Sequence, residues 1–272
     1  MKISIVTISF NQAKFLERAM RSVLDQGYEN LEYIVVDPGS TDGSRDIIEK
    51  YRNRLGAVVY DPDKGPADGL NKGFKHATGD VFGYINSDDQ LLPGSLACVA
   101  KAFAARPKAD VIMGDGYMTD EEGNVLRRVR STPHSPWWFV HGGVMVLQQS
   151  TFFKRQAYLD VDGFNIENKT SWDAELILRM AMQGKNIHAV HENWSAFTMQ
   201  PASITVSQRY ADESKRQHQR YYNMVMGRDK TQRDMLMGKV FGRMRQWILD
   251  PMALMYRVQD RFMPPEIKVT GI

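Results

Sequence analysis

Short apolar runs alternate with amphipathic segments through the first hundred residues of the chain. The runs have the length and the Ile, Val and Leu content of buried strands, and they lie at residues 3–8, 31–36, 57–60 and 80–85. The segments between them repeat apolar residues at helical spacing, and they lie at residues 13–24, 41–51 and 67–76. Strand–helix alternation over this length predicts an α/β fold, with a parallel sheet covered by helices on both faces.

Polar residues follow each predicted strand at its carboxyl end. These polar clusters are residues 9–11, 37–42, 61–65 and 86–89. In open α/β sheets, ligands bind beyond the carboxyl ends of the strands. We therefore expect all four clusters to face a single crevice.

The alternation weakens after Pro93. The later predicted elements are helices at 93–105 and 171–183 and a strand pair at 111–113 and 125–129. Residues 131–150 are rich in Pro, Trp and Gly, which indicates a loop that shapes a pocket. From residue 206 the chain is almost wholly helical and of different composition. We therefore divide it into a domain at 1–205 and a helical extension at 206–272.

The composition is that of a folded protein without structural cross-links. Of the 272 residues, 43% are hydrophobic and 25% are charged, which are ordinary globular values. The single cysteine, Cys98, excludes a disulfide framework and a cysteine-based zinc site. No apolar run approaches the length that spans a bilayer, and the first residues lack a signal-peptide cleavage site. We expect a cytoplasmic protein, free or at the inner face of the membrane.

Acidic residues stand directly after the predicted strand at 80–85. In the sequence Asn86-Ser87-Asp88-Asp89, carboxylates at a strand end are placed to hold a hard divalent cation, which prefers oxygen ligands. Such a cation can bind a diphosphate. The alternative is that the two aspartates cap the helix that starts near Pro93.

Further motifs extend this pattern in a fixed order along the chain. They are residues 7–11, 36–44, 64–73, 77–80 and 86–89, with the sequences TISFN, VDPGSTDGS, KGPADGLNKG, ATGD and NSDD. Together they resemble the family 2 glycosyltransferases over residues 2–205. The resemblance implies the GT-A fold, a Rossmann-like and mostly parallel central sheet flanked by helices, here followed by a C-terminal helical extension.

The resemblance also implies a donor site. Thr7 and Phe10 would line the pocket for the nucleotide base, Asp37 would hydrogen-bond the base or ribose, Asp68 would lie near the ribose and sugar, and Asp88 would contact a metal on the diphosphate. Other donor-side positions in the same motifs are Asn11, Gly39, Asp42, Asn71, Lys72, Asn86 and Ser87. As alternatives, Thr7 and Phe10 could pack in the core, and Asp37 or Asp42 could be turn or cap residues.

Two positions on the metal side depart from the family pattern. Asn86 stands where many relatives have aspartate, and Gln200 stands where histidine is common. An asparagine still offers a carbonyl oxygen, so we expect Mg²⁺ or Mn²⁺ on Asp88, with Asn86 as a second and weaker donor. His188, His191 and Asp42 are candidates to compensate.

The acceptor side is assigned from a later motif. Trp172-Asp173-Ala174-Glu175 resembles the acidic motif that precedes a Leu-rich helix in the family, where the first acid is the catalytic base. We assign this role to Asp173, against the alternative of a simple charge at a helix N-terminus. Trp172, Glu175 and Gln149 are placed on the acceptor side. In a helix, Asp173 and Glu175 point in different directions, so they would not act as an equivalent pair.

These assignments predict an inverting glycosyltransferase. It would move a sugar from a nucleotide diphosphate sugar, with a UDP-sugar favoured, to a hydroxyl of a glycan or lipid-linked acceptor in polysaccharide biosynthesis. The alternative is a non-catalytic module that binds nucleotide sugars. Dinucleotide and P-loop motifs are lacking, and we expect no nucleic-acid partner.

The extension differs from the rest of the chain in charge. Residues 201–272 hold thirteen Lys and Arg against seven Asp and Glu, a net charge of +6, whereas the preceding residues carry −3. An apolar stripe rich in Met runs from Met237 to Phe262, with a helix break predicted at Asp250–Pro251. The stripe suits docking on an anionic membrane surface. The alternative is packing on the catalytic domain or on a second subunit as a homo-dimer.

Overall fold

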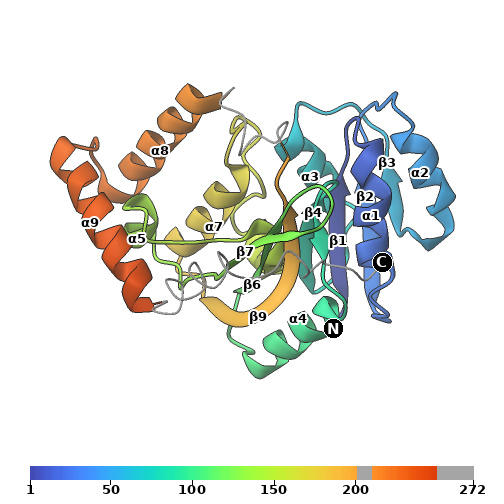
Figure 1. Cartoon of the computed structure of the whole chain (residues 1–272), viewed down its shortest axis with the longest axis horizontal. Helices are drawn as coiled ribbons and strands as arrows, with labels where there is room; N and C mark the ends of the chain where they lie inside the picture. The colour runs from blue at the N-terminus through green and yellow to red at the C-terminus, as the bar shows by residue number, and fades with distance from the viewer. Residues whose placement is uncertain (201–209, 250–272) are drawn as a thin grey trace.

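One mixed sheet forms the centre of the protein. The structure is a computed structural model, and it describes residues 1–200 and 210–249. Within these residues nine strands join in the order β3-β2-β1-β4-β8-β6-β9-β5, with β7 beside β6 (Figure 1). The strands are β1 (Ile3–Ile8), β2 (Leu31–Val36), β3 (Ala57–Val59), β4 (Val81–Asn86), β5 (Gln90–Leu91), β6 (Val111–Thr119), β7 (Val125–Val129), β8 (Thr151–Lys154) and β9 (Ile187–Thr198).

Helices cover both faces of this sheet. They are α1 (Ala13–Leu24), α2 (Ser44–Lys50), α3 (Pro66–Phe74), α4 (Ser95–Ala105), α5 (Pro136–Val140), α6 (Arg155–Leu159), α7 (Trp172–Met182), α8 (Ala211–Met226) and α9 (Gln232–Leu249). Within the described residues, this arrangement confirms the predicted α/β class. The prediction of a helix break at Asp250–Pro251, and of the stripe beyond it, lies outside the described residues.

The four strands predicted in the first hundred residues pair in parallel, as β1, β2, β3 and β4. In β1, Ile8 lies beside Val36 of β2 on one side and beside Asn86 of β4 on the other. The three strands therefore end at the same level. The segments that follow them emerge at one edge, as the polar clusters predicted.

The second half of the sheet departs from that parallel pattern. β8 pairs antiparallel with both β4 and β6, whereas β6 and β9 pair in parallel. The predicted strand pair exists as β6 and β7, but β7 pairs with Gly116–Thr119 of β6, whereas the predicted residues 111–113 pair with β8 and β9. The sequence pattern did not predict β5, β8 or β9. β5 and β8 are only two and four residues long, and the first half of β9 alternates weakly because several of its side chains are exposed.

Two apolar layers hold the helices on the sheet. Side chains alternate along β1, so that Val6 belongs to the apolar layer that contains side chains of α3 and α7, while Ile3 and Ile5 belong to the layer that contains side chains of α1 and α4. Residues 131–150 are only in part a loop at a pocket, since Gln148 and Gln149 line the cavity described below whereas residues 131–147 do not. They include α5, and Trp138 in it packs against Arg245 of α9 rather than lining the cavity described below.

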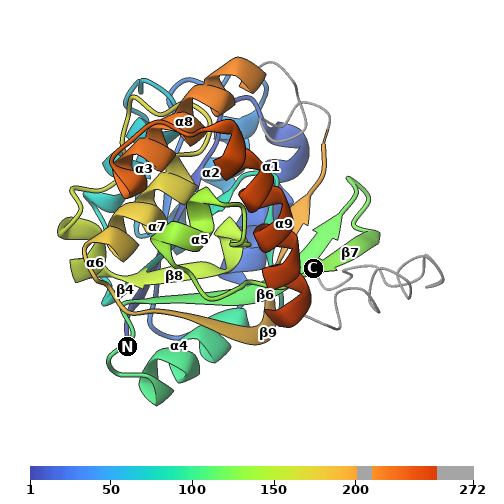
Figure 2. The same cartoon turned by 90° about the vertical axis from the view of Figure 1, so that its left-hand side faces the viewer.

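The described part of the C-terminal extension packs on the sheet's helical layer. Tyr221 and Tyr222 of α8 are fully buried and form an apolar cluster with Val140 of α5 and Leu178 of α7. Figures 1 and 2 show α8 and α9 on the side of the molecule that carries α5 and α7. These contacts are those of the packing alternative; the boundary at residues 205 and 206 lies outside the described residues and stays a prediction.

A close contact between β6 and β9 makes one glycine sensitive to substitution. A Cβ atom at Gly114 would lie 2.4 Å from the ring of Trp194, a fully buried side chain. We expect Gly114→Ala to destabilise the protein by about 1–3 kcal/mol because the ring has to shift in a packed core. Urea unfolding measures this loss. A double variant, Gly114→Ala/Trp194→Phe, should lose less than the sum of the two single variants, and an unchanged midpoint for Gly114→Ala would contradict the packing described.

Candidate functional site

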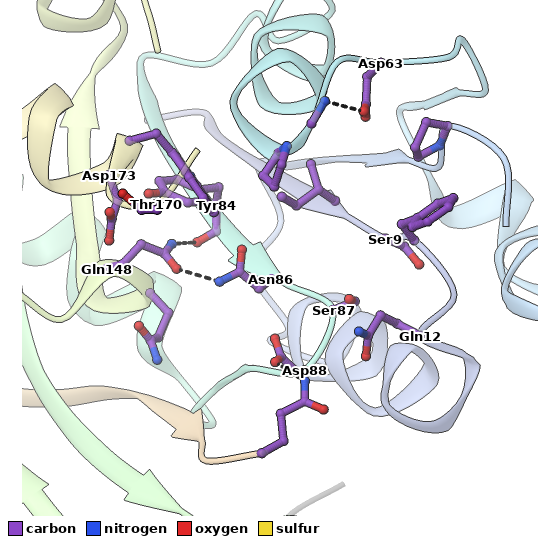
Figure 3. A pocket seen from close by; sticks show the side chains of 18 of the residues that line it. Ser9, Gln12, Asp63, Tyr84, Asn86, Ser87, Asp88, Gln148, Thr170 and Asp173 are labelled. Atoms are coloured by element: carbon purple, nitrogen blue, oxygen red, sulfur yellow. Dashed lines mark hydrogen bonds between the residues drawn. The ribbon is translucent and has the colours of Figure 1, made fainter. Parts of the chain in front are cut away.

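A hollow lies at the carboxyl ends of β1 and β4. It is a cavity of about 580 Å³, within the usual range for small-molecule sites. Its walls come from the end of β1, the residues before α3, the end of β4, the segment before β8, and the first turn of α7 (Figure 3). The lining residues on which the site depends are Ser9, Phe10, Asp63, Asn86, Ser87, Asp88, Gln148, Gln149, Thr170, Trp172, Asp173 and Gln200.

The residues at the end of β1 divide between the cavity and the core. The ring of Phe10 is 60% exposed and lines the cavity, so it does not pack in the core. Thr7 is fully buried and accepts a hydrogen bond from the hydroxyl of Tyr33 at 2.9 Å. Thr7 therefore supports the wall from behind and does not line the cavity.

The segment after β2 is organised by two aspartates. Asp37 is fully buried, and its Oδ1 accepts hydrogen bonds from the amides of Gly39 and Ser40 and from Arg45. Asp42 accepts from the amide and hydroxyl of Ser44 and from the amide of Ala13, at the starts of α2 and α1. These bonds lower the pKa of Asp42, the Ser44 hydroxyl most of all. Asp42 thus fixes the turn before α2, in keeping with the alternative of a turn residue; the N-cap of α2 is Gly43.

Two other predicted donor-side residues, Asn11 after β1 and Gly39 after β2, also lie outside the cavity lining. Asn11 accepts a hydrogen bond from the amide of Thr41 through its side-chain oxygen. Gly39 has a φ of 149°, which favours glycine at this turn. Both shape the loop, and neither touches the cavity.

The segment before α3 presents a residue that the sequence analysis did not single out. Asp68 accepts a hydrogen bond from the amide of Lys64 and pairs with Lys72 at 3.4 Å, while Asn71 bonds the backbone of Phe164. These three predicted donor residues lie outside the lining. Asp63 lines the cavity instead, and burial raises its pKa. The only signal for it was its place in the polar cluster at 61–65.

Asn86, at the end of β4, is held by a second residue that the sequence did not reveal. Its amide nitrogen donates to Gln148 Oε1 at 3.2 Å and to Asp89 Oδ2 at 3.3 Å. Gln148 in turn donates to the carbonyl of Tyr84 at 2.7 Å (Figure 3). Because the amide nitrogen of Asn86 is occupied, its side-chain oxygen is the atom left for a ligand.

The two aspartates after β4 have different partners. Asp88 lines the cavity, burial raises its pKa, and Gln200 donates a hydrogen bond to its Oδ2 at 2.5 Å. Asp89 is fully buried and accepts a hydrogen bond from the amide of Thr198; burial and the nearby Asp88 raise its pKa. Neither caps α4, whose N-cap is Gly94 without a side-chain hydrogen bond.

The donors near Asp88 suit a cation that is shared with a ligand. Within the described residues, no group of three or more His, Cys, Asp or Glu side chains is placed to hold a metal. Asp88, Asn86 and Gln200 offer one carboxylate and two amide oxygens, which are ligands that Mg²⁺ and Mn²⁺ accept. None of the compensating candidates joins them. Asp42 holds the turn before α2 and does not line the cavity. His191 lies 3.3 Å from Asp115, and neither His191 nor His188 lines the cavity.

The first turn of α7 brings one acid into the cavity and turns the other away. Asp173 lines the cavity, and burial raises its pKa. Trp172 and Gln149 line the cavity as well. The Glu175 side chain is only 1% exposed and is hydrogen-bonded to Asn168 and Arg220, so it does not face the acceptor side of the cavity.

Several polar atoms of the lining are buried without a hydrogen-bond partner. Within the described residues these are Ser9 Oγ, Gln149 Nε2, Thr170 Oγ1 and Trp172 Nε1. Buried polar groups nearly always have partners, and an unsatisfied one costs about 1–3 kcal/mol. The cavity is therefore suited to a ligand with several hydroxyl or phosphate oxygens.

Comparison with solved structures defines the class to which this fold belongs. The Staphylococcus aureus TarS fragment 1–349 in complex with UDP-GlcNAc is 19% identical, with a TM-score of 0.65 over 96% of this chain and 78% of that one. A mannosyltransferase from Pyrobaculum calidifontis, in complex with GDP-Man and Mn²⁺, is 18% identical, with a TM-score of 0.62 over 97% and 76%. The fold is that of the GT-A glycosyltransferases, as the resemblance implied.

Sequence comparison then identifies the family. The sequence model described as "Glycosyl transferase family 2" matches residues 4–165, more than half of the chain. The chain belongs to glycosyl transferase family 2 and is a glycosyltransferase.

Two relatives show the extent of the likeness. An uncharacterized glycosyltransferase of Mycobacterium tuberculosis is 32% identical over 66% of this chain and 69% of its own length. TuaG of Bacillus subtilis, named for teichuronic acid biosynthesis, is 36% identical over 49% of this chain; the match spans 54% of TuaG.

Proposed function

We propose that the cavity binds a UDP-sugar and that the chain transfers the sugar, with inversion, to a hydroxyl of a glycan or lipid-linked acceptor. One observation carries this proposal: Asp88, from the end of β4, and Asp173, from the first turn of α7, face the same cavity. The donor's diphosphate can then lie near Asp88 while the acceptor hydroxyl lies near Asp173, so that the two carboxylates have separate roles. Surface polysaccharide assembly is the setting that TuaG's name favours.

The donor would enter across the end of β1. The exposed ring of Phe10 offers a face on which a nucleotide base can stack, and the unpartnered hydroxyl of Ser9 lies beside it. Asp37 would hydrogen-bond the base or ribose through Oδ2, which is buried and has no hydrogen-bond partner in the described part of the chain. The UDP-GlcNAc held by the TarS fragment supports a uridine donor.

A divalent cation would be held by Asp88 and the side-chain oxygen of Asn86, together with the donor's phosphates. When bound, it neutralises the charge that develops on the departing diphosphate. The Asp88 carboxylate also accepts a hydrogen bond from Gln200 through Oδ2. The Mn²⁺ in the Pyrobaculum enzyme supports such an ion.

Asp173 would act as the general base. Burial raises its pKa, which makes its carboxylate a stronger proton acceptor than an exposed one. It takes the proton of the acceptor hydroxyl as that oxygen attacks the anomeric carbon opposite the leaving diphosphate. Attack from the opposite face inverts the anomeric configuration, and the unpartnered Gln149 and Trp172 are placed to orient the acceptor.

Nucleotide binding gives the first test. UDP with Mn²⁺ should raise the melting temperature of the full chain more than UDP alone or GDP with Mn²⁺, since ligand at a hundred times its Kd stabilises by about 2.7 kcal/mol. Asp88→Asn should lose the part of the shift that depends on Mn²⁺. Asp46→Asn, which changes an exposed aspartate on α2, is the control. An equal shift in Asp88→Asn, with and without Mn²⁺, would contradict the metal assignment.

The base assignment is tested by rate and pH. With water as the acceptor, Asp173→Asn should slow UDP release from UDP-glucose, UDP-galactose or UDP-GlcNAc by about 10²–10⁴-fold, and leave UDP binding intact. In the wild-type chain the rate should fall as pH is lowered through the raised pKa of Asp173, because a protonated carboxyl accepts no proton. Wild-type rates for Asp173→Asn would refute this role, and a wild-type chain that binds UDP-sugars without turnover would favour the non-catalytic alternative.

The outer face of α9 supports a membrane-surface role. Large apolar side chains from Leu236 to Ile248 are exposed along it, Trp247 by 61% and Ile248 by 73%, and Arg233 and Lys239 are exposed on the same helix. No helix of the described residues is long and apolar enough to cross a bilayer. We propose that α9 lies on an anionic lipid surface, where a lipid-linked acceptor is presented.

Vesicle co-sedimentation tests this surface. The full chain should bind phosphatidylcholine vesicles that contain phosphatidylglycerol, more weakly at high salt, and Leu236→Ser/Trp247→Ser/Ile248→Ser should lose this binding. Leu126→Ser/Leu159→Ser removes exposed apolar residues elsewhere and is the matched control. Binding unchanged in the α9 variant would overturn the proposal. So would a wild-type dimer that the α9 variant abolishes, since a second copy would then cover the face.

A further inference from the structure

We propose that α8 of the C-terminal extension is a positioning element for Asp173, acting through Arg220 and Tyr221. The inference rests on the proposed function, because it assumes that Asp173 is the base. Arg220 and Tyr221 lie beyond the part of the chain that matches the family model, which ends at residue 165. Their side chains bond to Glu175 and Ser171, which lie two positions after and two positions before Asp173.

Tyr221 holds the start of α7. Its hydroxyl donates to the carbonyl of Ser171 at 3.0 Å, and lies 2.7 Å from both the Ser171 hydroxyl and the amide nitrogen of Asn168. Ser171 is the N-cap residue of α7, directly before Trp172 and Asp173. Burial raises the pKa of Tyr221 to about 12, so its hydroxyl stays protonated and keeps this donor role.

Arg220 holds the same turn one step further along. Its guanidinium binds the carboxylate of Glu175 through both terminal nitrogens, at 2.9 and 3.3 Å. Glu175 is buried, and Asn168 donates to the same carboxylate at 2.7 Å. Glu175 also accepts hydrogen bonds from Asn165 and lies 3.9 Å from Arg179. Arg220, whose side chain is 43% exposed, is therefore one of several partners that hold this carboxylate.

The geometry of a helix explains why these two anchors act on Asp173. Successive residues turn by about 100°, so Ser171 and Glu175 lie on nearly the same side, and Asp173 lies about 200° from each. α8 therefore contacts the side of the first turn that lies opposite Asp173, while Asp173 lines the cavity. Loss of either anchor lets the turn rotate and moves the carboxylate. A displacement of about 1 Å can cost 10²-fold in rate.

Asn168 links the two anchors to the cavity wall. It is fully buried, and its side-chain oxygen accepts hydrogen bonds from the amides of Thr170 and Ser171, at 3.2 and 3.1 Å. Thr170 lines the cavity. The same bonds thus set both Asp173 and the wall beside it.

The test separates positioning from folding. Tyr221→Phe keeps the buried ring and removes only the hydroxyl, and Arg220→Met keeps the length of the side chain and removes its charge. Arg216→Met, on the same helix, removes a cation whose pair with Glu213 is exposed, and is the matched control. Each full-length variant is assayed for UDP release from UDP-glucose, UDP-galactose and UDP-GlcNAc with Mn²⁺, and for the melting shift given by UDP.

We expect Tyr221→Phe and Arg220→Met to lower kcat by about 10–100-fold, with KM and the UDP shift within twofold of wild type. Arg216→Met should match wild type. Arg220→Lys, which keeps the charge but not the two-pronged contact, should recover part of the kcat that Arg220→Met loses.

Each result decides between the inference and the function beneath it. If Asp173→Asn is inactive while Tyr221→Phe and Arg220→Met have wild-type kcat, the positioning role is overturned and the proposed function stands. If both α8 variants lose the UDP shift together with kcat, their role is structural and the inference also fails. If Asp173→Asn turns over UDP-sugars at the wild-type rate, the proposed base is wrong and the inference fails with it.

Discussion

The level ends of β1, β2 and β4 are the constraint on which the site depends. Parallel pairing places Ile8 between Val36 and Asn86, so the chain leaves three neighbouring strands at one edge. Hydrogen-bonded pairing fixes this register, because a slip of one residue would move every side chain of a strand to the opposite face, into the other apolar layer. The cavity lies over these strand ends, and the first turn of α7 forms its wall on the side of the antiparallel half of the sheet.

The sequence predicted the parts of the molecule that depend on local pattern. The parallel half of the sheet, its helices and the edge that carries the polar clusters follow from apolar periodicity and the position of polar residues after strands. Phe10, Asp88 and Asp173, which the family resemblance assigned to the site, line the cavity. Asp68 and Asn71, assigned in the same way, do not, because a motif shows which residues stand together in the sequence but not which of them face inward.

Long-range contacts could not be predicted in this way. Gln148 bonds the carbonyl of Tyr84 from 64 positions away, and Arg220 bonds Glu175 from 45 positions away. Neither contact leaves a periodic signal, since each partner is a single polar residue in an otherwise ordinary segment. β9 was missed because much of its first half is exposed, so burial did not impose the alternation that marks a strand.

The bond between Gln200 and Asp88 has a thermodynamic consequence for any ligand of that carboxylate. At 2.5 Å, it already satisfies one oxygen of Asp88 in a buried place. A ligand that takes this oxygen exchanges one partner for another, so its observed affinity is a difference between two bound states.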